Sequence, residues 1–198
     1  ILRSKMDANE YKNYLLGIVF YKYLSDSFLI KVYDMICDDK PESLKEALDT
    51  YVQELQGEDA DELIKEMKDE CHYIIEPELT YTCFADAARN NVFNREQLQK
   101  AFNNIEQSDP IFADLFADID LYSNRLGAGD QKQSDTIASL IREIDKADLL
   151  NTDAEILGNA YEYLIGQFAS ETGKKAGEFY TPQAVSKILT QIAIAGQE

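Results

Sequence analysis

The helical spacing of apolar side chains is the feature that most limits what this chain can fold into. A capping box at Asp7–Glu10 predicts a helix start, and a long apolar series follows it. That series consists of Tyr11, Tyr14, Leu15, Ile18, Val19, Tyr21, Leu24 and Phe28. A helix this apolar is unstable alone in solvent, so other helices must cover it. Only 9 glycines and 4 prolines occur in 198 residues, which disfavours a turn-rich β architecture.

Further helices are predicted wherever a start signal precedes apolar residues at helical spacing. They begin near Pro41 (with an end at Gly57), before Leu63, near Tyr81, and behind Asn94, Asp109, Ser134, Asp153 and Thr181. Tyr73–Leu79 is predicted to be extended, because Pro77 disfavours helix in the residue before it. No segment predicts a strand, and no period of 20–50 residues repeats. The predicted fold is all-α, an irregular bundle of about eight helices.

Features that would direct the chain to a membrane or out of the cell are missing from its sequence. No stretch approaches the roughly 18 uncharged apolar residues of a membrane span. Ile1–Lys5 does not form the apolar part of a secretory signal. The three cysteines are too few and too widely spaced for a disulfide framework. We therefore expect a cytoplasmic protein and, because position 1 is not Met, a piece of a longer product.

Two short patterns could suggest a site, and both have a simpler interpretation. Cys71 and His72 form the only neighbouring thiol–imidazole pair, and His72 is the only histidine. A metal or catalytic thiol site needs more ligands or a third orienting group, so we interpret the pair as a helix end and predict no metal ligands. The Gly-x-Gly of Gly127–Asp130 follows no predicted strand and is weak evidence for phosphate binding.

Half of the formal net charge of −18 lies in one segment. Residues 38–70 hold thirteen acidic residues and four lysines. Nucleic-acid binding usually appears as a basic stripe, because affinity comes largely from displacing counterions from phosphate. We therefore expect this segment to repel DNA and to form a solvated acidic face.

Composition changes after Phe168. Ala169–Gly177 is a polar run without apolar periodicity, which predicts a linker or loop. Behind it, Thr181 is suited to an N-cap and Pro182 to the first helical position. The first turn of a helix leaves N–H groups unpaired, and these favour a small anionic group such as a ligand carboxylate. Phe179 and Tyr180 would flank such a ligand, although an ordinary capped helix explains the same residues.

Two separated blocks of sequence add a family resemblance. The first consists of Met6–Lys12, Leu16–Phe20 and Lys22–Phe28, and the second of Gly158–Leu164, Phe168–Ala169 and Gly177–Pro182. In this order they resemble the opening helix and the inter-domain signature of the modification subunits of type I restriction–modification systems. The middle of the chain, roughly residues 35–150, is similar only in its general helical character.

The resemblance implies a helical domain followed by a Rossmann-like methyltransferase domain. That family's enzyme transfers a methyl group from S-adenosyl-L-methionine to adenine N6 in DNA. We therefore expect a helical N-terminal domain at 1–168, and a linker with the first helix of the methyltransferase domain at 169–198. The resemblance places cofactor contacts on Glu178, Phe179, Tyr180, Thr181, Pro182 and Gln183. A basic residue is common in the family at the position of Gln183.

Two family motifs are not found in this chain. One is the glycine-rich cofactor loop, and the other is the Asn-Pro-Pro-aromatic motif that holds the flipped adenine. The prolines follow Lys40, Glu76, Asp109 and Thr181, never Asn. Because the acceptor pocket needs these residues, we predict no catalytic residue here, weak or no cofactor binding, and no methyl transfer by this chain alone.

Partners follow from the same resemblance. It implies a specificity subunit that reads DNA, a second modification subunit, and restriction subunits that cut. The helical domain would then serve subunit assembly and close around DNA, with some of the 12 Tyr and 9 Phe in contacts and most in the core. The alternative is a free-standing acidic protein that mimics DNA or binds other proteins. A Thr-Pro capped helix behind a linker disfavours that alternative.

Overall fold

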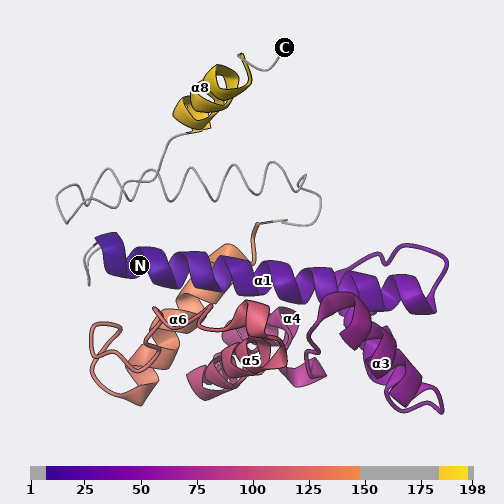
Figure 1. Cartoon of the computed structure of the whole chain (residues 1–198). Coiled ribbons are helices and arrows are strands. Elements are labelled where there is room, and N and C mark those ends of the chain that lie inside the picture. The colour runs from indigo at the N-terminus through magenta and orange to yellow at the C-terminus, as the bar shows by residue number, and fades with distance from the viewer. Residues whose placement is uncertain (1–7, 148–182, 196–198) are drawn as a thin grey trace. The chain divides into compact units, whose positions relative to one another are not determined.

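The structure is a computed structural model that describes residues 8–147 and 183–195. It divides into two compact units, Ile1–Asn151 and Thr152–Glu198, each described here by itself. All regular elements within the described ranges are helices, and these ranges contain no strand (Figure 1). The all-α prediction is confirmed for this part of the chain.

Residues 8–147 of the first unit form six α-helices and two short 3₁₀-helices. In chain order they are α1 (Ala8–Ile36), α2 (Leu44–Glu54), α3 (Ala60–Cys71), η1 (Pro77–Leu79), α4 (Tyr81–Arg89), α5 (Arg95–Ser108), η2 (Pro110–Phe112) and α6 (Asp130–Ile144). The second unit contributes α8 (Gln183–Ile194). The predicted helix behind Asp153 lies outside the described residues.

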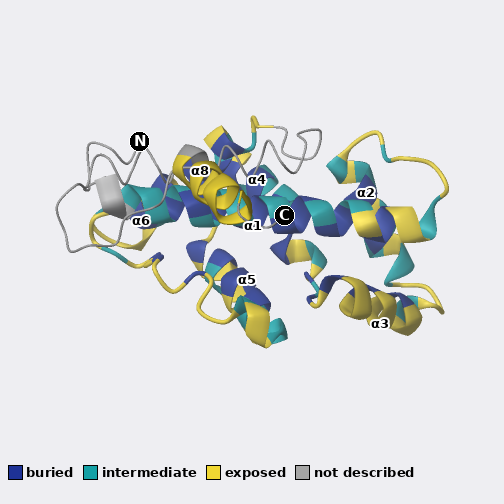
Figure 2. Ribbon diagram, turned by 45° about the horizontal axis from the view of Figure 1, so that its top comes forward, coloured by how far each residue is buried: buried dark blue, intermediate teal, exposed yellow. Residues whose placement is uncertain are grey.

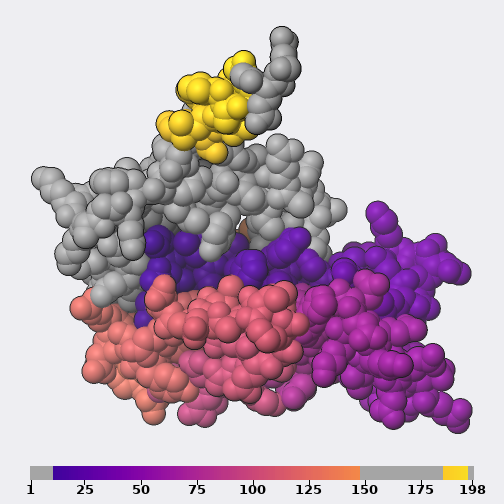
Figure 3. All heavy atoms as spheres, viewed as in Figure 1, coloured from indigo at the N-terminus to yellow at the C-terminus, as the bar shows by residue number. Residues whose placement is uncertain are grey.

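The 29-residue helix α1 is the element around which the first unit is built. It packs against α2, α3, α4 and α6. Burial continues along almost its whole length, from Tyr14 to Tyr33 (Figure 2). The acid-rich pair α2 and α3 lies at one end of α1 and helix α6 at the other (Figures 1 and 3). The apolar series that predicted a covered helix is thus confirmed.

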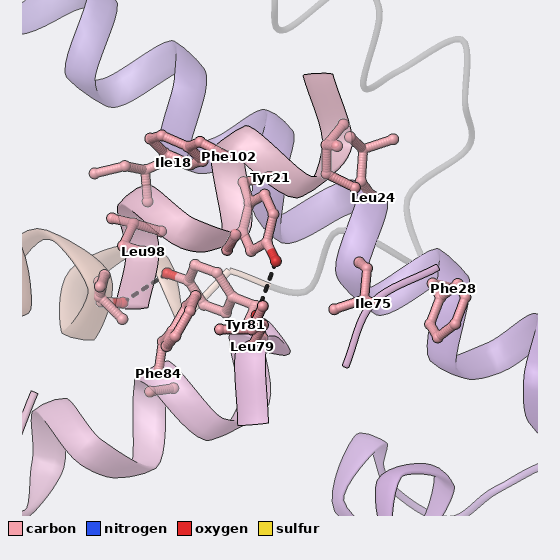
Figure 4. Close-up of a cluster of buried hydrophobic side chains, with 14 of the residues drawn as sticks. Ile18, Tyr21, Leu24, Phe28, Ile75, Leu79, Tyr81, Phe84, Leu98 and Phe102 are labelled. Atoms are coloured by element: carbon pink, nitrogen blue, oxygen red, sulfur yellow. Dashed lines mark hydrogen bonds between the residues drawn. The ribbon is translucent and has the colours of Figure 1, made fainter. Parts of the chain in front are cut away.

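Aromatic side chains form much of the core, and their hydroxyl groups join separate elements (Figure 4). Tyr21 of α1 donates a hydrogen bond to the Leu79 carbonyl over 2.8 Å. Tyr81 of α4 donates to the Ile141 carbonyl of α6 over 2.9 Å. Burial raises the pKa of both phenols, so they remain protonated donors. These tyrosines add apolar area and at the same time satisfy buried backbone carbonyls.

A buried polar group lies between α1 and α4. The ammonium of Lys22 is 2.5 Å from a carboxylate oxygen of Asp26, one turn further along α1. The same ammonium lies 5.0 Å from the centre of the Tyr81 ring. Ser25 accepts a hydrogen bond from the backbone N–H of Tyr81 over 2.7 Å. The two contacts made by Tyr81 fix the position of α4 along α1, because a shift of one turn would leave the buried Tyr81 N–H without its acceptor and move its ring away from the Lys22 ammonium.

Three helix starts differ from the sequence-based prediction. Helix α2 begins after Ser43, whose hydroxyl accepts from the Glu46 N–H, and not at Pro41. Helix α6 begins at Asp130 behind Gly129, so Ser134 lies inside the helix and does not cap it. Asp109 caps only the 3₁₀-helix η2, because the backbone leaves helical geometry at Ala113, at ψ 135°.

Candidate functional site

The predicted cofactor segment falls almost entirely outside the described residues. This holds for Glu178, Phe179, Tyr180, Thr181 and Pro182. Gln183 is the first residue of α8, so the structure places its backbone in the first turn of a helix. The cofactor role of all six residues stays a prediction.

Helix α8 presents an apolar stripe. Val185, Ile188, Leu189 and Ile192 recur at three- and four-residue spacing, and their side chains are 44% to 68% exposed. Lys187 and Thr190 lie on the opposite side of the helix by the same periodicity, and Thr190 donates to the Ser186 carbonyl over 2.9 Å. An exposed stripe of this kind is typical of a helix that packs on another layer of structure.

The Cys71–His72 pair is a helix end, as the sequence predicts. Cys71 is the last residue of α3 and is buried, and this burial raises the pKa of its thiol. His72 ends the helix in the left-handed conformation at φ 66°, with Nδ1 3.7 Å from a carboxylate oxygen of Asp109. Within the described residues, no three His, Cys, Asp or Glu side chains gather as metal ligands.

The acidic segment 38–70 forms α2, α3 and the turns beside them. Most of its apolar residues face the core, with Leu48, Tyr51, Leu63 and Met67 buried. Most of its acidic side chains are exposed, and its ion pairs, such as Lys45–Asp49 at 2.8 Å, lie on the surface. The prediction of a solvated acidic face is confirmed, and this surface is unsuited to DNA.

A pocket that the sequence analysis did not identify lies between α6 and the turn that joins α4 to α5. Its volume is about 190 Å³. The residues that line it are Asn91, Phe93, Asp135, Ala138, Ser139 and Arg142. Because they come from segments about 45 residues apart, only the packing of α4 on α6 brings them together. The one sequence signal was the helical spacing of Asp135, Ser139 and Arg142 on a single face of α6.

Arg142 is the half-buried cation of this pocket. One terminal nitrogen, Nη1, donates to the Ala88 carbonyl at the end of α4 over 2.6 Å. The other, Nη2, donates to the Ser139 hydroxyl over 2.9 Å. These two bonds hold the guanidinium in place, while its remaining N–H groups are available to a further acceptor.

Comparison with known families assigns both parts of the chain. The model of the HsdM N-terminal domain matches residues 1–144, which is more than half of the sequence. The chain belongs to the HsdM N-terminal domain family. A second model, N-6 DNA Methylase, matches residues 152–198. The resemblance that the two sequence blocks indicated is thereby confirmed.

Individual relatives agree with the family. The chain is 27% identical to the methylase subunit of the type I restriction enzyme MpnII from Mycoplasma pneumoniae, over all of this chain and 38% of the relative. It is 23% identical to the MjaIX methylase subunit from Methanocaldococcus jannaschii, over 96% of this chain and 33% of the relative. It thus spans about a third of the length of the curated relatives it matches.

A solved structure extends the similarity to three dimensions. The crystal structure of a type I restriction–modification methyltransferase subunit from Streptococcus thermophilus is 50% identical, with a TM-score of 0.93. The match covers 99% of this chain and 42% of that chain.

None of the helices described in the HsdM-family chain is long and apolar enough to cross a lipid bilayer.

Proposed function

We propose that this chain is the N-terminal region of the methyltransferase subunit of a type I restriction–modification enzyme. The complete protein transfers a methyl group from S-adenosyl-L-methionine to adenine N6 in DNA. The observation that carries this proposal is the pair of family matches in one chain, an HsdM N-terminal domain followed by a segment that matches N-6 DNA Methylase. The 50% identity to a solved type I methyltransferase subunit over 99% of the chain supports it.

In this proposal residues 1–168 form the helical domain, and 169–198 form a linker and the first helix of the methyltransferase domain. Glu178, Phe179, Tyr180, Thr181, Pro182 and Gln183 contact the cofactor. The start of α8 at Gln183 supports this assignment, because N–H groups in a first helical turn favour an anionic ligand group. The exposed stripe of α8 packs on the sheet of the complete domain.

The helical domain serves assembly and DNA enclosure rather than methyl transfer. Its partners are a specificity subunit, a second modification subunit and the restriction subunits. The packing of α2, α3, α4 and α6 on the long, buried helix α1 supports an architectural role. We assign no catalytic residue to this chain and place the protein in the cytoplasm.

Titration of S-adenosyl-L-methionine into this chain and into the full-length protein tests the proposal. We expect saturable binding by the full-length protein and binding at least roughly tenfold weaker by this chain, a loss of about 1.4 kcal/mol or more. In the full-length protein, Tyr180→Ala weakens binding, whereas the matched control Tyr122→Ala, on the surface of the bundle, does not.

The assembled enzyme is then assayed for methyl transfer to DNA. Absence of methyl transfer by the complete assembly would overturn the proposed function. Equal affinity of this chain and the full-length protein for the cofactor would overturn the view that the cofactor pocket is completed outside it. A free-standing acidic protein, the alternative, would give neither cofactor binding nor methyl transfer in any form.

A further inference from the structure

Acidic residues are unevenly distributed over the helical bundle. Residues 38–70 hold thirteen acids against four lysines, and residues 105–124 hold five acids and no basic residue. The two segments on either side of the pocket at α6 are not acidic overall. Residues 89–104 carry three basic residues and one acid, and residues 125–147 carry four of each. A polyanion is therefore repelled least at the face that α6 and the α4–α5 turn share.

Ion pairs neutralise most of the acids on this face. Asp86 of α4 and Asp145 at the end of α6 both pair with Arg89. Glu143 pairs with Lys146 at 2.8 Å. Asp135 is the acid that lines the pocket itself, and it accepts a hydrogen bond from the Gln131 amide over 2.9 Å.

The pocket offers donors in fixed positions. The Arg142 guanidinium is held by the Ala88 carbonyl and the Ser139 hydroxyl, as described above. Asn91 also lines the pocket, is in the left-handed conformation at φ 58°, and has an exposed side chain that ends in an amide. Guanidinium and amide N–H groups are among the donors that proteins use for phosphate oxygens, and guanidinium can bind them in a bidentate way.

We propose that this pocket receives a phosphodiester group of the DNA on which the assembled enzyme acts, with Arg142 as the principal donor and Asn91 as a second one. The proposal rests on the proposed function, because it takes DNA as the substrate. It assigns the face of α6 and the α4–α5 turn to the DNA and leaves the acidic face of α2 and α3 directed away from it. The contact positions the bundle and reads no base sequence.

Binding of DNA by the complete enzyme, assembled from full-length subunits, tests the proposal as a function of salt. Arg142→Gln removes one phosphate contact, so we expect binding roughly five- to tenfold weaker at 0.1 M salt. The slope of log K against log salt falls in magnitude by about 0.9, equally for specific and nonspecific DNA. Since Arg142 also caps α4, thermal unfolding of the variant is measured alongside.

Asp135→Asn removes the negative charge from the pocket and should strengthen DNA binding about two- to fivefold. Because misfolding would weaken DNA binding, a gain in affinity separates the loss of this charge from loss of structure. The matched control Glu62→Gln makes the same charge change on the exposed face of α3 and should leave binding unchanged, since salt screens distant charges. If Asp135→Asn and Glu62→Gln affect binding equally, or Arg142→Gln leaves the slope unchanged, the pocket is not a phosphate site. In that case methyl transfer by the wild-type assembly still supports the proposed function, whereas its absence would overturn both.

Discussion

Gly17 shows how one residue sets the approach of two segments. It lies inside α1, where glycine costs about 1 kcal/mol of helix stability relative to alanine. A Cβ atom at this position would overlap the Cδ1 of Ile119 and lie 3.3 Å from its Cγ1. Nearby, Tyr14 donates to the Asp120 carbonyl over 2.6 Å. The missing side chain therefore allows the segment around Ile119 to pack directly on α1.

Gly17→Ala should destabilise the chain by about 1 kcal/mol, because overpacking costs about 1–3 kcal/mol and outweighs the gain in helix propensity. Ile119→Val removes the overlapping Cδ1 and alone costs about 0.5–1.5 kcal/mol. The double variant should then be at least as stable as Ile119→Val. Its loss of unfolding free energy would be smaller than the sum of the two single losses by about 1 kcal/mol or more. Urea unfolding of the four proteins measures it, and additive effects would show that Gly17 is not needed for this contact.

At the scale of the element, helix starts show what the sequence could and could not predict. The start of α4 and the Asn94 cap of α5 were predicted correctly, because in each case the start signal stands next to an apolar face in the sequence. The starts of α2 and α6 were not predicted correctly. Each has a second possible start nearby in the sequence, and the choice between them depends on packing. At Gly129, φ 86° permits the turn into α6, and Arg95 holds Asp130 in the first turn over 2.6 Å.

The pocket at α6 could not be predicted for a related reason. Its residues are ordinary surface types in the sequence, and their meeting depends on Tyr81 and Arg142, which attach α4 to α6. By contrast, the local Thr-Pro pattern predicted a helix start at Thr181, and the family resemblance placed the cofactor contacts beside it. Local patterns thus indicated elements and a motif, whereas long-range contacts determined the pocket.

Two serines provide a matched test of the observed helix starts. Ser43 caps α2, so Ser43→Ala should cost about 1 kcal/mol. Ser134, which the sequence predicted as a cap, lies inside α6, so Ser134→Ala should be neutral or stabilising by up to about 0.5 kcal/mol. Thermal or urea unfolding compares the two. A larger cost at Ser134 than at Ser43 would contradict the helix starts described above.

At the scale of the whole molecule, the two units differ in how their apolar residues are covered. In the first unit α1 is surrounded, with Ile18, Phe28 and Val32 fully buried. In the second, the stripe of α8 is exposed, with Ile192 68% accessible. A 12-residue helix has little stability of its own in water, because helix nucleation is costly and few residues follow the nucleus. The order of α8 therefore depends on a surface that covers its stripe.

Hydrogen exchange should reveal this dependence. In this chain the backbone amides of α8 should exchange with little protection, while those at the centre of α1 should exchange only on global unfolding. In the full-length protein, where we propose that a sheet covers the stripe, protection of α8 should rise by at least about a hundredfold, and that of α1 should stay within a few-fold. Ile188→Asp in the full-length protein should remove the gain in α8, whereas Lys187→Ala, on the polar side, should not. Equal protection of α8 in both proteins would mean that the stripe is not the surface on which the methyltransferase domain is built.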